Sequence, residues 1–168
     1  MPNWTRNLVR WIDALNYRIG RVTMYLLFVM MGVMLWSSAS KVVHLPANWT
    51  LEMAQFLFVA YYLLGAPYSL QLDTNVRMDL VYGRLHVRTK AFVDVLTMFA
   101  LIFYLCVMLY GAVESTIYSF AVNEYSPTAW RPPLWPVKVT ICLAFVLMIL
   151  QSISIFIKDI AAWRGKDI

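Results

Sequence analysis

Three charged residues, Asp73, Arg77 and Asp79, fall within seven positions at the end of the apolar stretch Gly65–Leu80 (GAPYSLQLDTNVRMDL). Ionisable groups deep in a membrane are costly and mark ion or proton pathways. The same charges at the membrane surface would only mark the point where the chain leaves the bilayer. The depth of these residues therefore decides between an ion-coupling site and an exit from the membrane, and depth depends on the surrounding elements.

Four stretches of 19 or 20 residues contain no Asp, Glu, Lys or Arg: Val22–Ser40, Met53–Leu72, Val95–Val113 and Val139–Ile157. A helix that rises about 1.5 Å per residue needs about 20 residues to cross a hydrocarbon core of roughly 30 Å. Strands of a membrane barrel would be about 10 residues long with alternating polarity, which these stretches lack. With 61% hydrophobic and 14% charged residues, the sequence predicts an all-α integral membrane protein with four transmembrane helices.

No segment outside the spans is long enough to bury a core, so residues 1–168 are expected to form a single membrane domain. The N-terminal arm carries apolar residues at helical spacing among arginines, which predicts a short amphipathic segment at the membrane interface. The expected segments are an interfacial arm at 1–21, spans at 22–43, 49–70, 91–115 and 135–157, a cytoplasmic loop at 73–90, a periplasmic loop at 116–134 and a cytoplasmic tail at 158–168.

Basic residues alternate along the chain in a way that predicts its orientation. Lys and Arg number 4 before the first span, then 1, 4 and 2 in the three connections, and 3 in the tail, which accounts for all 14. Cytoplasmic segments carry the excess of Lys and Arg, so both termini and the middle loop are expected in the cytoplasm. The net charge of +5 thus reflects topology, and no nucleic-acid partner is expected. Asp73, Arg77 and Asp79 then emerge on the cytoplasmic side, outside the hydrocarbon, where we interpret Arg77 and Asp79 as a bracket around the exit.

The motifs of catalysis and coupled transport are missing from this sequence. No ionisable residue lies near the middle of a span, which argues against a transport pathway within the chain. No catalytic residues, cofactor site or metal site are expected, because no Ser-His-Asp set, Gly-rich phosphate loop or metal-ligand spacing is found. The small cluster Ser37–Ser40 is expected to be a helix contact whose partner the sequence does not identify. Polar residues within the spans are expected to bond to neighbouring helices: Gln55, Thr97, Gln151, Ser152 and Ser154.

These features predict a non-enzymatic accessory membrane subunit, and one other class stays open. A membrane anchor of an electron-transfer complex would need axial haem ligands, commonly a pair of histidines. His44 and His86 are the two histidines of the chain, and the expected topology places them on opposite sides of the membrane. Met ligands, or a histidine from another subunit, keep this alternative open.

The order of features resembles the small permease subunit (DctQ type) of tripartite ATP-independent periplasmic (TRAP) transporters. The resemblance covers nearly the whole chain and is spread over several segments. At one polar position the family often has His, where this sequence has Asn75. The segments that carry the resemblance are WTLEMAQFLFVAYYLLGAPYSL, TNVRMDLVYGRL, VRTKAFVD, NEYSPTAWRPPLWPVK and LQSIS.

The resemblance implies a multi-pass protein of the bacterial cytoplasmic (inner) membrane that acts in secondary active transport. In the family, a periplasmic binding protein captures an organic acid, and a large permease subunit (DctM type) imports it by sodium symport. The small subunit braces the large one, and Na⁺ is expected to bind the large subunit. Glu52 and the periplasmic loop face the side where the binding protein arrives, although Glu52 also suits the positive N-terminus of a helix. The candidate interface residues are Glu52, Arg77, Asp79, Glu124, Arg131, Trp135 and Pro136.

Overall fold

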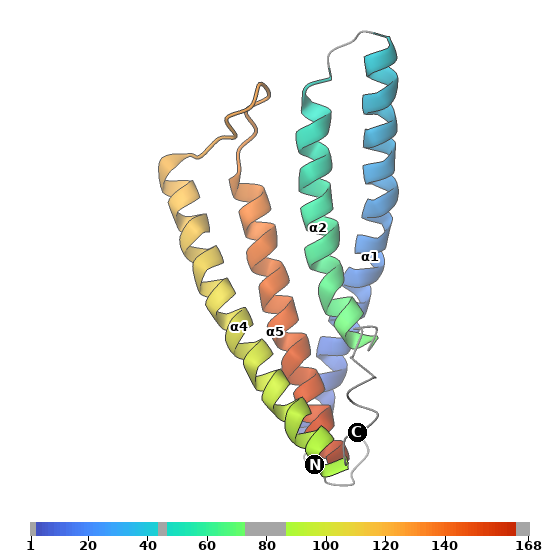
Figure 1. Cartoon of the computed structure of the whole chain (residues 1–168), viewed down its shortest axis with the longest axis vertical. Coiled ribbons are helices and arrows are strands. Elements are labelled where there is room, and N and C mark those ends of the chain that lie inside the picture. Colours follow the sequence, from blue (N-terminus) through green and yellow to red (C-terminus); the bar gives the residue numbers. More distant parts are fainter. Residues whose placement is uncertain (1–2, 44–46, 73–86, 164–168) are drawn as a thin grey trace.

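The computed structural model describes residues 3–43, 47–72 and 87–163 and folds them into four long helices (Figure 1). The helices are α1 (Asn3–Val42), α2 (Trp49–Gln71), α4 (Val87–Val122) and α5 (Trp135–Trp163). Each contains a stretch that is long and apolar enough to cross a membrane: Arg6–Val42, Trp49–Gln71, Leu96–Val122 and Trp135–Lys158. Strand-like pairing within the described residues is limited to an isolated bridge between Tyr125 and Pro133. The predicted all-helical membrane fold is confirmed.

The first helix differs from the expected arrangement, because no break separates the interfacial arm from the first span. A helix of 40 residues is about 60 Å long, roughly twice the hydrocarbon thickness. Val9, Ile12 and Asn16 are each 2% exposed or less, and α1 packs against α2 and α5. Because this face is buried by other helices, the segment continues the helix instead of turning onto the membrane surface. Two other helices are also longer than the expected spans. α4 extends beyond 91–115 at both ends, and α5 continues past residue 157 to Trp163.

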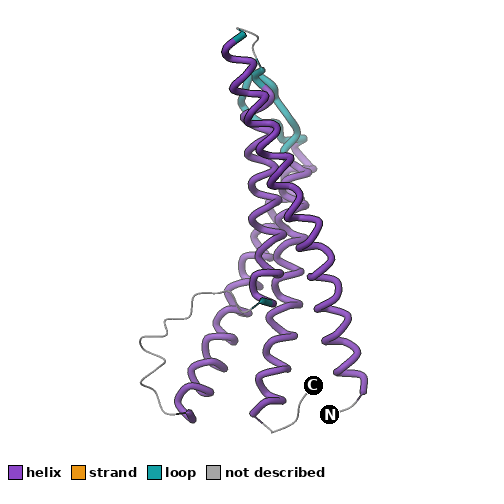
Figure 2. The backbone as a smooth tube through the Cα atoms, turned by 90° about the vertical axis from the view of Figure 1, so that its right-hand side faces the viewer, coloured by secondary structure: helices purple, strands orange, loops and turns teal. Residues whose placement is uncertain are grey.

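The helices pack side by side in the order α4, α5, α2, α1, and α5 also contacts α1. The first residues of α1 and the last of α5 lie at one end, which we call the inner end. The last residues of α1, the first residues of α2 and the connection between α4 and α5 lie at the other end, the outer end (Figure 1). Seen after a 90° turn, the helices overlap in a narrow column toward the outer end and spread apart toward the inner end (Figure 2). In the membrane-crossing window 28% of residues are buried in α5 but 6% in α4. α5 is therefore the central helix, and α4 lies at the edge.

Small side chains allow α1 and α2 to approach closely at both ends. Near the inner end, Gly20 packs against Tyr68, and a Cβ atom at position 20 would lie closer than 3.0 Å to the Tyr68 side chain. Near the outer end, the hydroxyl oxygens of Ser37 and Thr50 are 2.9 Å apart. Small residues are the usual means of close helix packing in lipid, where apolar burial gives little preference for protein over lipid contacts. Ser37 of the Ser37–Ser40 cluster thus contacts α2, whereas Ser38 and Ser40 donate to backbone carbonyls of α1 itself.

Candidate functional site

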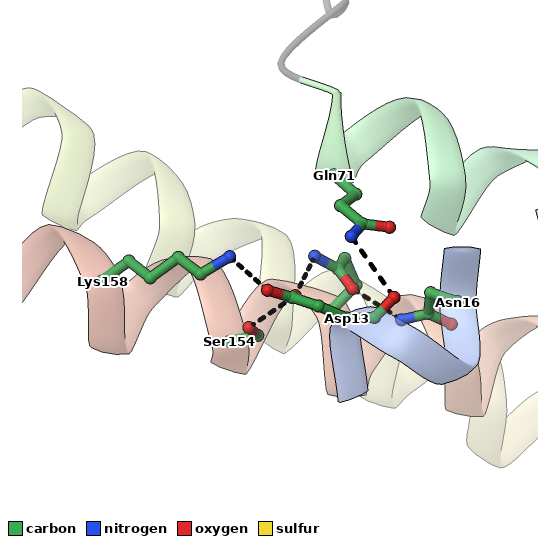
Figure 3. A network of polar contacts seen from close by, with 6 residues as sticks. Asp13, Asn16, Gln71, Ser154 and Lys158 are labelled. Atoms are coloured by element: carbon green, nitrogen blue, oxygen red, sulfur yellow. Dashed lines mark hydrogen bonds and ion pairs between the residues drawn. The ribbon is translucent and has the colours of Figure 1, made fainter. Parts of the chain in front are cut away.

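Six polar side chains from three helices meet near the inner end of the molecule (Figure 3). We call this cluster the inner polar network. α1 contributes two of its members, α2 contributes one, and α5 contributes three that follow one face of the helix. The members are Asp13, Asn16, Gln71, Gln151, Ser154 and Lys158.

The carboxylate of Asp13 is the centre of the inner polar network. Its Oδ2 atom lies 2.5 Å from the Lys158 ammonium group. Its Oδ1 atom accepts hydrogen bonds from Gln151 Nε2 at 3.2 Å and from Ser154 Oγ at 3.1 Å. The backbone carbonyl of Asp13 accepts a further bond from Gln71 Nε2 at 3.3 Å. Asp13 therefore ties α1 to α5 through its side chain and to α2 through its backbone.

Gln151 provides the most deeply buried contact of the network, since it is 0% exposed and its partner Asn16 is 1% exposed. Its Oε1 atom accepts a hydrogen bond from Asn16 Nδ2 at 2.6 Å, and its amide nitrogen donates to Asp13. Leaving a buried polar group without a partner costs about 1–3 kcal/mol. A register shift between α1 and α5 would separate these groups, so the network favours a single register at the inner end.

The ion pair of the network lies at the edge of the packed region. The Asp13 side chain is 21% exposed and the Lys158 side chain 40%, so solvent screens their attraction in part. The two charges cancel, and the remaining members are neutral amides and a hydroxyl. This composition suits helix positioning rather than proton transfer. Among the described residues, no group of three or more His, Cys, Asp or Glu side chains gathers that could hold a metal ion.

Sequence reasoning identified part of this network. Gln151 and Ser154 were predicted to bond to neighbouring helices, and the structure confirms this for both. Ser152 instead donates to the Met148 carbonyl of its own helix. The central pairing of Asp13 with Lys158 was missed, because 145 positions separate the two residues and no local spacing signals such a contact.

The connection between α4 and α5, Asn123–Leu134, forms a short structure that we call the outer hairpin. The amide of Ser126 donates to the Pro132 carbonyl at 3.0 Å, and the amide of Leu134 donates to the Glu124 carbonyl at 3.1 Å. Asn123 and Arg131 adopt positive φ angles of 49° and 48°, which non-glycine residues seldom do. The outer hairpin is therefore a defined turn, and its Arg131 side chain is exposed.

An ion pair and an aromatic contact fasten the outer hairpin to the helices below it. Lys138 Nζ lies 2.6 Å from Glu124 Oε2 and also donates to the Ser115 carbonyl at 3.3 Å. Chiefly because Lys138 donates this hydrogen bond, the pKa of the Glu124 carboxyl lies below its usual range. The rings of Phe120 and Trp135 are 5.5 Å apart. Lys138 was not among the predicted site residues, although its spacing of 14 positions from Glu124 suits two residues that flank a hairpin.

The structure brings four of the seven predicted interface residues together, places Glu52 elsewhere and does not describe the other two. Glu124, Arg131, Trp135 and Pro136 all lie in or directly after the outer hairpin. Glu52 lies in the first turn of α2, but it is 6% exposed and its Oε2 atom has no hydrogen-bond partner. Arg77 and Asp79 lie outside the described residues, as do His44 and His86. The roles predicted for all seven interface residues stay predictions.

Comparison with known proteins gives one match. The model of the family described as "Tripartite ATP-independent periplasmic transporters, DctQ component" matches residues 30–162. The matched region begins in the second half of α1, includes all of α2 and α4, and ends one residue before the last residue of α5. No curated protein and no solved structure matches the chain.

Proposed function

The chain belongs to the DctQ family of tripartite ATP-independent periplasmic transporters, and we propose that it braces the large permease subunit of such a transporter. The assembly would carry out Na⁺-coupled uptake of an organic acid delivered by a periplasmic binding protein. The large subunit (DctM type) would hold Na⁺ and the substrate. The small subunit would contribute no transport pathway of its own, and it would act as a membrane scaffold, not an enzyme.

The observation that carries this proposal is the exposed surface of the four helices. In the membrane-crossing window of α4 only 6% of residues are buried within the chain. Large apolar side chains such as Phe99, Phe103 and Tyr110 are each more than 60% exposed. A side-by-side arrangement of helices leaves broad surfaces for lipid and for another membrane protein. The inner polar network supports the bracing role, because it holds three of the helices in one register.

The outer hairpin is proposed to face the periplasm and to contact the binding protein. Its hydrogen-bonded turn presents the exposed side chains of Tyr125 and Arg131. A guanidinium group at an exposed site is well suited to carboxylates on a partner. The orientation follows from the excess of Lys and Arg expected in the cytoplasm, and the proposed location is the bacterial inner membrane.

Reconstitution tests the scaffold role. Proteoliposomes containing the large subunit alone, this chain alone, and both together would be supplied with the binding protein, an organic acid and a Na⁺ gradient. Uptake is expected only where both membrane subunits are present, and the two should co-purify in mild detergent. Na⁺-dependent uptake with this chain as the only membrane component would refute the proposal.

A charge reversal tests the docking role of the outer hairpin separately. Arg131→Glu should weaken uptake at limiting binding-protein concentration while leaving co-purification with the large subunit intact. Lys41→Glu, which changes an exposed basic residue near the outer end of α1, is the matched control. Equal uptake by the wild type and by Arg131→Glu across binding-protein concentrations would exclude this contact.

A further inference from the structure

An open groove lies on one face of the molecule, toward the inner end. Its volume is about 580 Å³, within the range of about 300–1,000 Å³ that is usual for small-molecule sites. All four described helices contribute to its mainly apolar walls. The residues that matter for the argument are Gly20, Met24, Tyr62, Gly65, Leu101 and Met148.

A missing side chain at Gly65 keeps the groove open. A Cβ atom placed on Gly65 would meet a single neighbouring atom, Thr23 Cγ2, at 4.0 Å. A longer side chain at this position would therefore extend into the hollow without a clash at its base. Tyr62 stands beside the groove and is 66% exposed. The mainly apolar lining of the groove suits a hydrocarbon chain.

At the inner end of the groove, which we call its rim, Tyr68 packs against Tyr17, and Arg21 lies on the Tyr17 ring and brings a positive charge to this end. Tyr68 lines the groove, and its ring lies 5.8 Å from the ring of Tyr17. The Arg21 guanidinium donates a hydrogen bond to the Tyr17 hydroxyl and lies 4.6 Å from the centroid of that ring. Arg21 directly precedes the charge-free stretch that begins at Val22, so it lies where the hydrocarbon is expected to begin.

The charges near this rim are predominantly positive. Arg10 lies eleven positions before Arg21, which places it on the same stripe of α1 as Tyr17 and Arg21, and it is exposed. The acidic residue nearest in sequence, Asp13, is neutralised by Lys158. Arg21 keeps most of its five N–H donors after the single bond to Tyr17. A guanidinium group of this kind binds phosphate oxygens well, often with two hydrogen bonds.

We propose that this groove is a binding site for an anionic phospholipid. The acyl chain lies in the groove beside Gly65 and Met148, and the headgroup phosphate is bound by Arg21. An apolar groove that ends at a cation at the membrane boundary matches the two parts of such a lipid. Free phosphate would leave the apolar walls unused, and a neutral lipid would leave the basic rim without a counter-charge. The site belongs to this chain and does not depend on its proposed place in a transporter.

Native mass spectrometry of the full chain, purified in mild detergent and stripped of lipid, tests the site. The protein is titrated with phosphatidylglycerol and, separately, with phosphatidylcholine of the same acyl chains. One phosphatidylglycerol is expected to bind more tightly than any phosphatidylcholine. Arg21→Ala should reduce the affinity for phosphatidylglycerol about tenfold or more, the loss expected for a charge-assisted hydrogen bond. It should reduce the affinity for phosphatidylcholine less, because the choline cation already offsets the charge of that phosphate. Glycerol phosphate, which has no acyl chain, should not compete.

Two glycine substitutions separate the groove from general lipid coating. Gly65→Leu places a branched side chain in the groove, where the acyl chain would lie, and should abolish the tight phosphatidylglycerol adduct. Gly111→Leu adds the same side chain on α4, where a Cβ atom meets nothing within 4 Å, and should retain the adduct. Circular dichroism of each variant shows whether it is folded. Equal binding of the two lipids, or a tight adduct that survives in folded Gly65→Leu or in Arg21→Ala, would overturn the proposal.

Discussion

At the scale of single residues, Asp13 is the side chain on which the inner end depends most. Its carboxylate accepts from Lys158, Gln151 and Ser154 together. Asp13→Leu removes the carboxylate and leaves Lys158, Gln151 and Ser154 without this hydrogen-bond acceptor. We expect a loss in unfolding free energy on the order of 1–3 kcal/mol, the usual cost of a buried polar group left unsatisfied. Denaturation of the purified chain in detergent, followed by circular dichroism, measures this loss.

The control for Asp13 is a carboxylate on the exposed surface. Glu114 accepts a hydrogen bond from Tyr110 on the outward face of α4, so Glu114→Leu should change the stability by less than about 0.5 kcal/mol, as surface substitutions usually do. Asp13→Asn keeps the shape of the side chain and should fall between Asp13→Leu and the wild type. If Asp13→Leu unfolds at the same denaturant concentration as Glu114→Leu, the inner polar network contributes nothing to stability.

Glu124 should make the outer hairpin sensitive to acid. Its pKa in the folded protein is lowered, chiefly by the hydrogen bond from Lys138, from an ordinary value of 4.5. A lowered folded pKa stabilises the hairpin at pH values above 4.5, and this contribution is lost as the pH falls through the lower folded value. Hydrogen exchange of the segment 123–138 should therefore show more frequent opening of the wild-type hairpin at pH 3 than at pH 6.

The matched control for this acid sensitivity is Glu124→Gln, which cannot titrate. Intrinsic exchange rates also change with pH, so the meaningful quantity is the difference in protection between the two proteins at each pH. This difference should be largest at pH 6 and become smaller as the pH falls below 4.5 toward the lower pKa of folded Glu124. A constant difference over that range would show that the Glu124–Lys138 pair does not contribute in the way proposed.

At the scale of elements, the crossing of α1 and α2 depends on Gly20. Any side chain at this position would overlap Tyr68, so Gly20→Leu should separate the two helices. Overpacking a contact of this kind usually costs about 1–3 kcal/mol. Thermal unfolding should show a lower midpoint for Gly20→Leu than for the wild type.

Gly32 provides a control on the same helix. A Cβ atom at position 32 meets nothing within 4 Å, so Gly32→Leu gains the same helix propensity without the clash. Tyr68→Ala should restore part of the stability of Gly20→Leu, because it removes the atoms that clash. An unfolding midpoint for Gly20→Leu equal to that of Gly32→Leu would contradict the predicted close approach.

The elements also show what local sequence signals can predict. Stretches without charged residues identified all four membrane-crossing helices, because the thickness of the bilayer imposes a length that is independent of tertiary contacts. The continuation of α1 through residues 3–21 could not be predicted in this way. Its reason is the burial of Val9, Ile12 and Asn16 against distant helices, which an amphipathic pattern alone cannot distinguish from contact with a membrane surface.

At the scale of the whole molecule, the two polar sites were predictable to different degrees. The outer hairpin is built from residues close together in the sequence, so its prolines and charged residues were sufficient to predict Glu124 and Arg131 as candidate interface residues. The inner polar network joins the first helix to the last. In the sequence, its charged members Asp13 and Lys158 are indistinguishable from the charged residues that commonly flank a membrane span. Contacts between the ends of the chain depend on the helix order α4, α5, α2, α1, which no local spacing encodes.

The orientation of the whole molecule is a prediction that two positions can test. The first residues of α1 and the last residues of α5 lie at the same end of the molecule (Figure 1). Labelling one residue at each end of the molecule is therefore sufficient to determine its orientation in the membrane. Thr128 in the outer hairpin and Arg10 in α1 are both exposed. With Cys106 and Cys142 replaced by alanine, Thr128→Cys in spheroplasts should react with a membrane-impermeant maleimide. Arg10→Cys should react only after the membrane is permeabilised.

The physical reason for this expectation is that the inner end carries most of the basic side chains. Arg6, Arg10, Arg18 and Arg21 precede the charge-free stretch of α1, whereas Lys41 alone follows it before α2. Lys and Arg near the ends of a span are retained on the cytoplasmic side, and acidic residues have little influence. Labelling of Arg10→Cys in intact spheroplasts, with Thr128→Cys protected, would reverse the orientation. The outer hairpin could then no longer meet a periplasmic binding protein, although the bracing of a large subunit within the membrane would be unaffected.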